Sequence, residues 1–205
     1  MKQVGSVHDQ YQVNARAKAY RENNPQFADW AAGYGLITHS DLTQVRVHDM
    51  VTWLVESGTV SSPEAAYERL CAADRVASAA MWLVVHMTYA KTVYTDGRML
   101  AADDFKPDPQ GHTGGALNMA VAYTGYLAAN ALCGTTRSWL MGQGHCVAAI
   151  DAANLIVDNL SEEQAARYGY SDAGVTAFVR DFYSCGIDQR GLPTSPLGSH
   201  VNPHT

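Results

Sequence analysis

Two histidines that follow glycines are the residues of this chain best suited to chemistry. His112 lies in the run Gly111-His112-Thr113-Gly114-Gly115, and His145 closes the run Gly142-Gln143-Gly144-His145. Glycine lets the backbone approach a ligand closely, a helix N-terminus favours an anion, and a neutral imidazole can accept and donate protons. The two runs therefore predict a site for a phosphorylated ligand with acid–base chemistry beside it.

Each of these histidines also has a purely structural interpretation. His112 precedes an apolar helix, where an imidazole that binds no ligand caps or solvates the turn. His145 ends a Gly-x-Gly run that is neither a P-loop nor a dinucleotide fingerprint, so the run alone is a weak signal. His86 lies within an apolar helix and is interpreted as a core histidine.

His200 and His204 are four positions apart, which is metal-ligand spacing on a helix. Pro203 between them excludes a continuous helix, so the pair predicts no zinc site, and no metal ligands are expected in the chain. His200 either reaches into a pocket from its loop or is solvated. Cys146, at a helix start, is interpreted as structural because no base is clearly paired with it.

Apolar periodicity and capping residues predict a helix-rich chain, with residues 41–60 as one helix or mixed structure. The expected helices span residues 11–22, 26–32, 63–72, 75–94, 116–132, 146–157, 161–168 and 171–183. Ser61 with Glu64 and Ser161 with Gln164 have capping-box spacing, and Asp74 is expected to cap the long apolar helix. The short apolar run 138–141 is consistent with a buried parallel strand, so the predicted class is α/β with an incomplete parallel sheet.

In that arrangement His145 follows the carboxyl end of a strand, where open α/β sheets bind phosphates. Three polar residues on the predicted helices either support the ligand-contacting residues without touching the ligand or are ordinary polar interruptions of apolar helices: Asn118, Asp151 and Asn154. Residues 1–40 are expected to form an arm, and the tail from Cys185 shows neither a helical nor a strand period.

Composition excludes several classes of function. The chain has 205 residues, 47% of them hydrophobic and 17% charged, which is enough apolar material for a core. A net charge of −6 argues against a nucleic-acid partner, which needs a basic face. The start lacks a signal-peptide pattern and no apolar run predicts a membrane span, so a cytoplasmic protein is expected. Four cysteines without a Cys-x-x-Cys pair predict neither a disulfide framework nor a structural zinc.

Three motifs in this order resemble the N-terminal thiamine-diphosphate domain of the transketolase superfamily, and its phosphoketolase branch in particular. Gly111 to Asn118 is similar to the family's Gly-His-Trp-Gly-Thr…Gly-Leu-Asn, and Gly142 to His145 to its Gly-Pro-Gly-His. The segment from Gly191 to Pro203 is similar to its Gly-Gly-Ile-Pro-Ser-His-x-x-Pro. The resemblance covers roughly residues 100–205.

The resemblance implies a lyase that cleaves the C2–C3 bond of xylulose 5-phosphate or fructose 6-phosphate. Inorganic phosphate captures the two-carbon unit, which gives acetyl phosphate and an aldose phosphate. In the transketolase alternative, the two-carbon unit is transferred to another aldose. The cofactor supplies the electron sink and the protein supplies placement and proton transfer. The implied catalytic residues are His112, His145 and His200. The implied cofactor contacts are Gly142, Gly144 and His145, and the implied substrate contacts are His112, Gly114, Asn118 and His200.

The sequence departs from the family pattern at Thr113, Gly115 and Gln143, where the family has tryptophan, threonine and proline. The Gly-Asp-Gly stretch that binds magnesium in the superfamily is not found, so the magnesium site is expected outside this chain. Residues 41–205 are therefore expected to be the first part of the cofactor-binding domain, and this part is expected to be inactive alone. The rest of the enzyme or a partner chain would complete it, and the complete enzyme is expected to be a homo-oligomer. A non-catalytic binding module is the remaining alternative.

Overall fold

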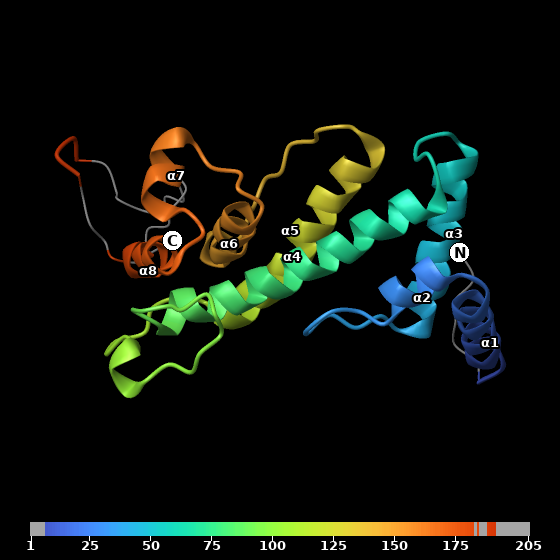
Figure 1. Ribbon diagram of the computed structural model, residues 1–205, viewed down its shortest axis with the longest axis horizontal. Helices are drawn as coiled ribbons and strands as arrows, with labels where there is room; N and C mark the ends of the chain where they lie inside the picture. The colour runs from blue at the N-terminus through green and yellow to red at the C-terminus, as the bar shows by residue number, and fades with distance from the viewer. Residues whose placement is uncertain (1–6, 183, 185–187, 192–205) are drawn as a thin grey trace. The chain divides into compact units, whose positions relative to one another are not determined.

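The structure is a computed structural model that describes residues 7–182, 184 and 188–191. Helices form its regular structure, and within those residues there is no β-strand, only two isolated bridges that join Tyr34 to Ile37 and Ala90 to Phe105. The predicted α/β class with a parallel sheet is therefore wrong for this part of the chain, which is all-α (Figure 1).

The run 138–141 shows why the strand prediction failed. A parallel strand needs neighbours that satisfy its N–H and C=O groups, and no other described segment supplies a partner strand. Trp139 instead packs its ring edge-to-face on Tyr123, with the ring centroids 5.4 Å apart, while Leu140 is 94% exposed. His145 consequently follows a loop rather than the end of a strand.

Most of the predicted helices are present. The α-helices are α1 (Val7–Asn23), α2 (Pro25–Ala31), α3 (Asp41–Glu56), α4 (Pro63–Tyr89), α5 (Thr113–Cys133), α6 (Ala148–Ile156), α7 (Glu162–Tyr168) and α8 (Asp172–Asp181). Two short 3₁₀ helices, η1 (Ala102–Asp104) and η2 (Gly144–Cys146), lie in the connections. The capping box of Ser161 and Gln164 is confirmed at α7, and Ser171 caps α8.

The start and the length of α4 differ from the prediction. Ser62, not Ser61, provides the side-chain oxygen that accepts from Ala65 N–H at this end, directly before Pro63. Asp74 caps no helix, because α4 continues through it and its carboxylate is hydrogen-bonded to His39. By length and composition alone, α4 could cross a membrane, a property it shares with core helices of soluble proteins.

The chain forms two compact units. The first contains the described residues up to Ser78 together with Gly125–Arg137. Its core is built on edge-to-face and tilted aromatic rings, with Phe27 5.5 Å from Tyr67 and 5.7 Å from Trp30. Val51, Leu54 and Leu132 are buried in the same cluster.

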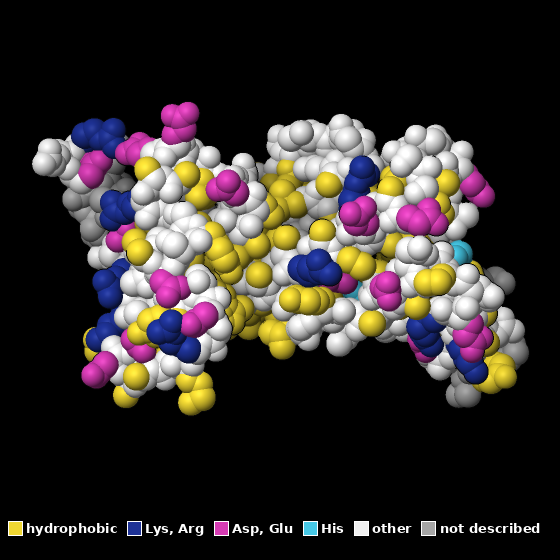
Figure 2. Space-filling model, in the orientation of Figure 1, with side chains coloured by type: hydrophobic (Ala, Val, Ile, Leu, Met, Phe, Trp, Pro, Cys, Tyr) yellow, Lys and Arg dark blue, Asp and Glu magenta, His cyan; other side chains and the backbone are white. Residues whose placement is uncertain are grey.

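The second unit contains Ala79–Thr124 and the described residues from Ser138 onward, and it holds both glycine-flanked histidines. Its buried side chains include Leu83, Met87, Val93, Val175 and Phe178. Hydrogen bonds fix the start of α8 to the segment after α4, since Thr176 Oγ1 accepts from the Val93 N–H at 3.0 Å. Large hydrophobic side chains are exposed in both units, and apolar side chains are visible over the face drawn in Figure 2.

Candidate functional site

His112 is the N-cap of α5. Its Nδ1 accepts a hydrogen bond from the Gly115 N–H at 3.1 Å, and its carbonyl accepts from Ala116 N–H at 3.3 Å. An imidazole that accepts through Nδ1 is neutral and carries its hydrogen on Nε2. His112 therefore caps α5, and the cap leaves an N–H donor on the exposed ring.

Gly111 explains how the chain reaches this position. Its φ of +129° lies in the region that favours glycine. An added Cβ would also lie 3.1 Å from Phe182 Cε1 and 3.1 Å from Thr88 Oγ1. The glycine before His112 is thus required by backbone conformation and by packing.

His145 lies beside His112. The two ring centroids are 4.5 Å apart and the rings meet edge-to-face at 72°. His145 is held on η2, where the Cys146 N–H donates to the Gln143 carbonyl at 2.9 Å. Both histidines are exposed, so the pair is open to a ligand from solvent.

Cys146 is the third member of this cluster, and sequence reasoning gave it no chemical role. Each of the three residues offers one donor atom, a ring nitrogen or the thiol sulfur, and these three atoms lie within 4.8 Å of one another: His112, His145 and Cys146. The Cys146 side chain is buried, and this burial raises the pKa of its thiol. A Cβ on Gly115 would lie 2.7 Å from Cys146 Sγ and 2.8 Å from His112 Nδ1. Gly115 is thus the residue that allows the thiol and the imidazole to meet across the start of α5.

The other predicted residues are placed around the cluster in different ways. Gly142 and Gly144 lie in an open loop, where an added Cβ meets nothing within 4 Å. Gly114 and Asn118 are exposed on α5. His200 lies outside the described residues.

The predicted supporting residues Asn154 and Asp151 lie on α6, and His86 lies on α4. Asn154 accepts a hydrogen bond from the Tyr123 hydroxyl at 3.1 Å, and Asp151 is buried in α6. His86 donates from Nδ1 to the Trp82 carbonyl at 2.8 Å, one turn back along α4, and its side chain is only partly buried.

Lys106 is a titratable residue that the sequence did not single out. Burial lowers the pKa of its ammonium to about 8, and Nζ donates to the Met87 carbonyl at 2.7 Å. The ammonium lies 5.9 Å from the centre of the Phe182 ring, the ring that packs beside Gly111. No local pattern marks this lysine, because its burial depends on α4 and on Phe182.

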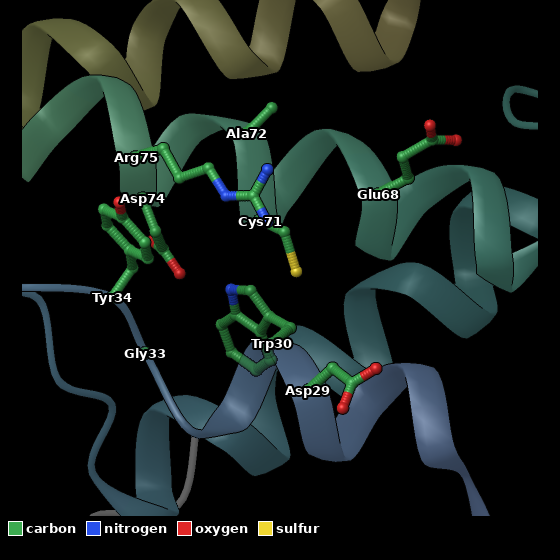
Figure 3. A pocket seen from close by; sticks show the side chains of 9 residues that line it. All are labelled: Asp29, Trp30, Gly33, Tyr34, Glu68, Cys71, Ala72, Asp74 and Arg75. Atoms are coloured by element: carbon green, nitrogen blue, oxygen red, sulfur yellow. The ribbon is translucent and has the colours of Figure 1, made fainter.

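A separate cavity of about 560 Å³ lies in the first unit, between α2 and α4 (Figure 3). The Arg75 guanidinium lies over the Tyr34 ring at 5.7 Å, and the Trp30 indole forms part of the wall. The cavity is lined by Asp29, Trp30, Gly33, Tyr34, Glu68, Cys71, Ala72, Asp74 and Arg75. None of the predicted site residues is among them.

Comparisons with protein-family models, with curated proteins and with solved structures give no match for this chain. Two exposed imidazoles at contact distance can exchange protons with a small ligand. Two imidazoles and a thiol can also bind a metal ion of borderline softness.

Proposed function

We propose that this chain contributes the histidine-bearing side of a thiamine-diphosphate-dependent, phosphoketolase-like site that cleaves the C2–C3 bond of a ketose phosphate. The observation that carries the proposal is the 4.5 Å contact between the rings of His112 and His145, which come from two separate glycine-flanked motifs. The all-α architecture gives no support from the fold, so the proposal depends on this pair and on the order of the motifs.

The loop that carries His145 suits a diphosphate. Gly142 and Gly144 have no positive φ, and an added Cβ on either meets nothing within 4 Å. The packing of the described residues therefore does not explain these glycines, whereas a ligand laid against the backbone would. Magnesium needs oxygen ligands, which the His112, His145 and Cys146 cluster does not supply, so its ligands lie elsewhere.

The histidines have distinguishable roles in this proposal. Thiamine diphosphate, when bound, supplies the electron sink for the bond cleavage. Because Gly115 N–H occupies Nδ1 of His112, Nε2–H of that ring donates to the carbonyl or a hydroxyl of the ketose phosphate. The exposed imidazole of His145 takes the proton that a substrate hydroxyl releases, because its ring lies against that of His112 and therefore beside the same ligand.

The test is a titration of metal-free protein with fructose 6-phosphate, in which NMR monitors the signals of the histidine rings. The signals of His112 and His145 are expected to shift together, while His86, hydrogen-bonded within α4, serves as the internal control. His112→Asn is the matched variant, because asparagine retains the cap but removes the imidazole. The proposal is overturned if saturating ketose phosphate shifts the signal of neither histidine ring. It is also overturned if inorganic phosphate alone shifts these signals and the ketose phosphate does not.

A second measurement addresses the cofactor. Calorimetry with thiamine diphosphate and magnesium is expected to show weak binding that Gly144→Ala weakens further, because the added methyl group would occupy the space beside the backbone. Gly125→Ala, on α5 with open space around it, is the control. Equal binding by the two variants would remove Gly144 from the cofactor site.

A further inference from the structure

We propose that His112, His145 and Cys146 form a binding site for zinc or a similar divalent transition-metal ion. Two exposed imidazoles and one buried thiol converge here from the N-cap of α5 and from η2. The inference does not rest on the proposed function, since it uses only the chemistry and the positions of these three donor atoms.

The donor set is one that zinc prefers. Zinc binds thiolate sulfur and imidazole nitrogen in tetrahedral geometry, and sites with three protein ligands leave the fourth position for water or another ligand. Calcium and magnesium require oxygen donors, so this cluster discriminates against them. The set of two nitrogens and one sulfur therefore defines the class of ion.

The observed separations are close to those of a bound site. Tetrahedral zinc with ordinary bond lengths places its nitrogen and sulfur ligands about 3.5 Å apart. The three donor atoms already lie within 4.8 Å of one another. Both imidazoles are exposed, and small rotations of their side chains bring the nitrogens inward while Cys146, anchored in the interior, stays in place.

Gly115 provides the space in which these ligands approach. A side chain there would overlap both Cys146 Sγ and His112 Nδ1. If the ion binds through Nδ1 of His112, it replaces the hydrogen bond from Gly115 N–H. If it binds through Nε2, the proton moves to Nδ1, which can then no longer accept from Gly115 N–H and must donate to another group. Either arrangement keeps His112 next to the other two ligands.

Charge also has to be balanced. Binding releases the thiol proton of Cys146 to solvent, and the resulting thiolate cancels one of the two charges of the ion. The N-terminus of α5 adds a partial positive charge beside the remaining one. Both favour an anion, such as hydroxide or inorganic phosphate, as the fourth ligand.

Cobalt(II) is the spectroscopic probe for this site, because tetrahedral thiolate ligation gives a thiolate-to-cobalt charge-transfer band. We expect one equivalent of cobalt, added to chelator-treated protein, to produce this band and one equivalent of zinc to abolish it. His145→Asn is expected to weaken cobalt binding by about tenfold or more, which corresponds to about 1.4 kcal/mol. Cys146→Ser should remove the charge-transfer band.

The matched controls are Cys71→Ser and Cys133→Ser, which change half-exposed thiols of the first unit and should leave the band unchanged. Zinc should also raise the melting temperature of the unaltered chain but not of His145→Asn, whose exposed position makes misfolding a poor explanation. Absence of the band at stoichiometric cobalt, or its persistence in Cys146→Ser, overturns the metal site. Neither result bears on the sugar-phosphate titration, which is done without metal.

Discussion

At the scale of single residues, Gly115 governs whether His112 and Cys146 can lie side by side. Gly115→Ala places a methyl group 2.7 Å from Cys146 Sγ and 2.8 Å from His112 Nδ1, so one of them must move. We expect a loss of about 1–3 kcal/mol in the free energy of unfolding, as for other overpacked sites, together with weaker cobalt binding. Urea denaturation and the cobalt titration measure the two effects.

Gly125→Ala is the control for this change, because it lies on the same helix with nothing within 4 Å of an added Cβ. Alanine is the better helix former, so this variant should gain up to about 1 kcal/mol. If Gly115→Ala were as stable as Gly125→Ala and bound cobalt equally well, the close approach of the thiol and the imidazole would be wrong.

Lys106 predicts a pH dependence of stability. Its pKa falls from 10.5 to about 8 on folding, so between these values the unfolded chain binds a proton that the folded chain does not. The contribution of this group to the free energy of unfolding therefore rises with pH in that window, by at most about 2 kcal/mol between pH 7 and pH 9.5, because solvent screens a partly exposed ammonium; the full penalty is present below pH 8. Lys106→Met keeps an apolar stem but removes the charge, and it should flatten this rise.

The measurement is urea denaturation at several pH values below about 9.5, where tyrosine ionisation does not yet contribute. Burial raises the pKa of Tyr67 and Tyr168, so these groups reduce stability only at higher pH, as the unfolded tyrosines ionise. The same slope in both proteins would show that the Lys106 ammonium is solvated.

At the scale of elements, a side-chain pair joins the interior of α4 to the segment before α3. His39 Nε2 and Asp74 Oδ2 are 2.8 Å apart, both side chains are nearly buried, and the His39 ring stacks on Trp30 at 4.3 Å. Asp74→Ala should reduce the free energy of unfolding by about 1–3 kcal/mol because it leaves a buried ring nitrogen without its partner. Helix content by circular dichroism should not fall, since alanine favours a helix interior.

A double-mutant cycle with His39→Phe separates the pair from other effects of the substitutions. Phenylalanine retains the stacking on Trp30, so the coupling energy should report the hydrogen bond. A fall in helix content on Asp74→Ala, with no coupling to His39, would instead support the capping role that the sequence had predicted.

The helices themselves were largely predictable. Capping boxes and apolar periodicity are local signals, and Ser161 caps α7 as expected. At α8 the cap is Ser171, one of two neighbouring residues that could have served. The prediction that Asp74 caps a helix was wrong, although aspartate and asparagine favour helix caps. Here His39, 35 positions away, hydrogen-bonds the Asp74 carboxylate, so that Asp74 can lie inside the helix. The strand predicted at residues 138–141 was wrong because a strand depends on hydrogen bonds to partner strands, and a local apolar pattern does not show whether such partners exist.

The candidate site was predictable in part for the same reason. The two glycine-flanked motifs identified His112 and His145, whose rings meet in the structure. Cys146 and Gly115 were not given chemical roles, because their importance comes from a contact between η2 and α5 that no local spacing encodes. Lys106 was missed because its perturbed pKa results from tertiary burial.

At the scale of the whole molecule, the division into two compact units predicts that each unit can be destabilised separately. Phe27 is fully buried among the aromatic rings of the first unit. Phe27→Ala should cost about 3–5 kcal/mol there through lost apolar contacts and the cavity left behind. Hydrogen exchange followed by mass spectrometry should then show faster exchange in α1 to α3 and unchanged protection in α8.

Phe178→Ala is the reciprocal variant, because this ring is fully buried in α8 of the second unit and meets Tyr168 edge-to-face at 5.5 Å. It should accelerate exchange in α7 and α8 and spare α2 and α3. Since the boundary of the units falls within α4 and α5, the exchange of those two helices should respond to both variants, each at the end that belongs to the altered unit. A uniform increase along the chain for either substitution would mean that the two cores unfold as one cooperative body.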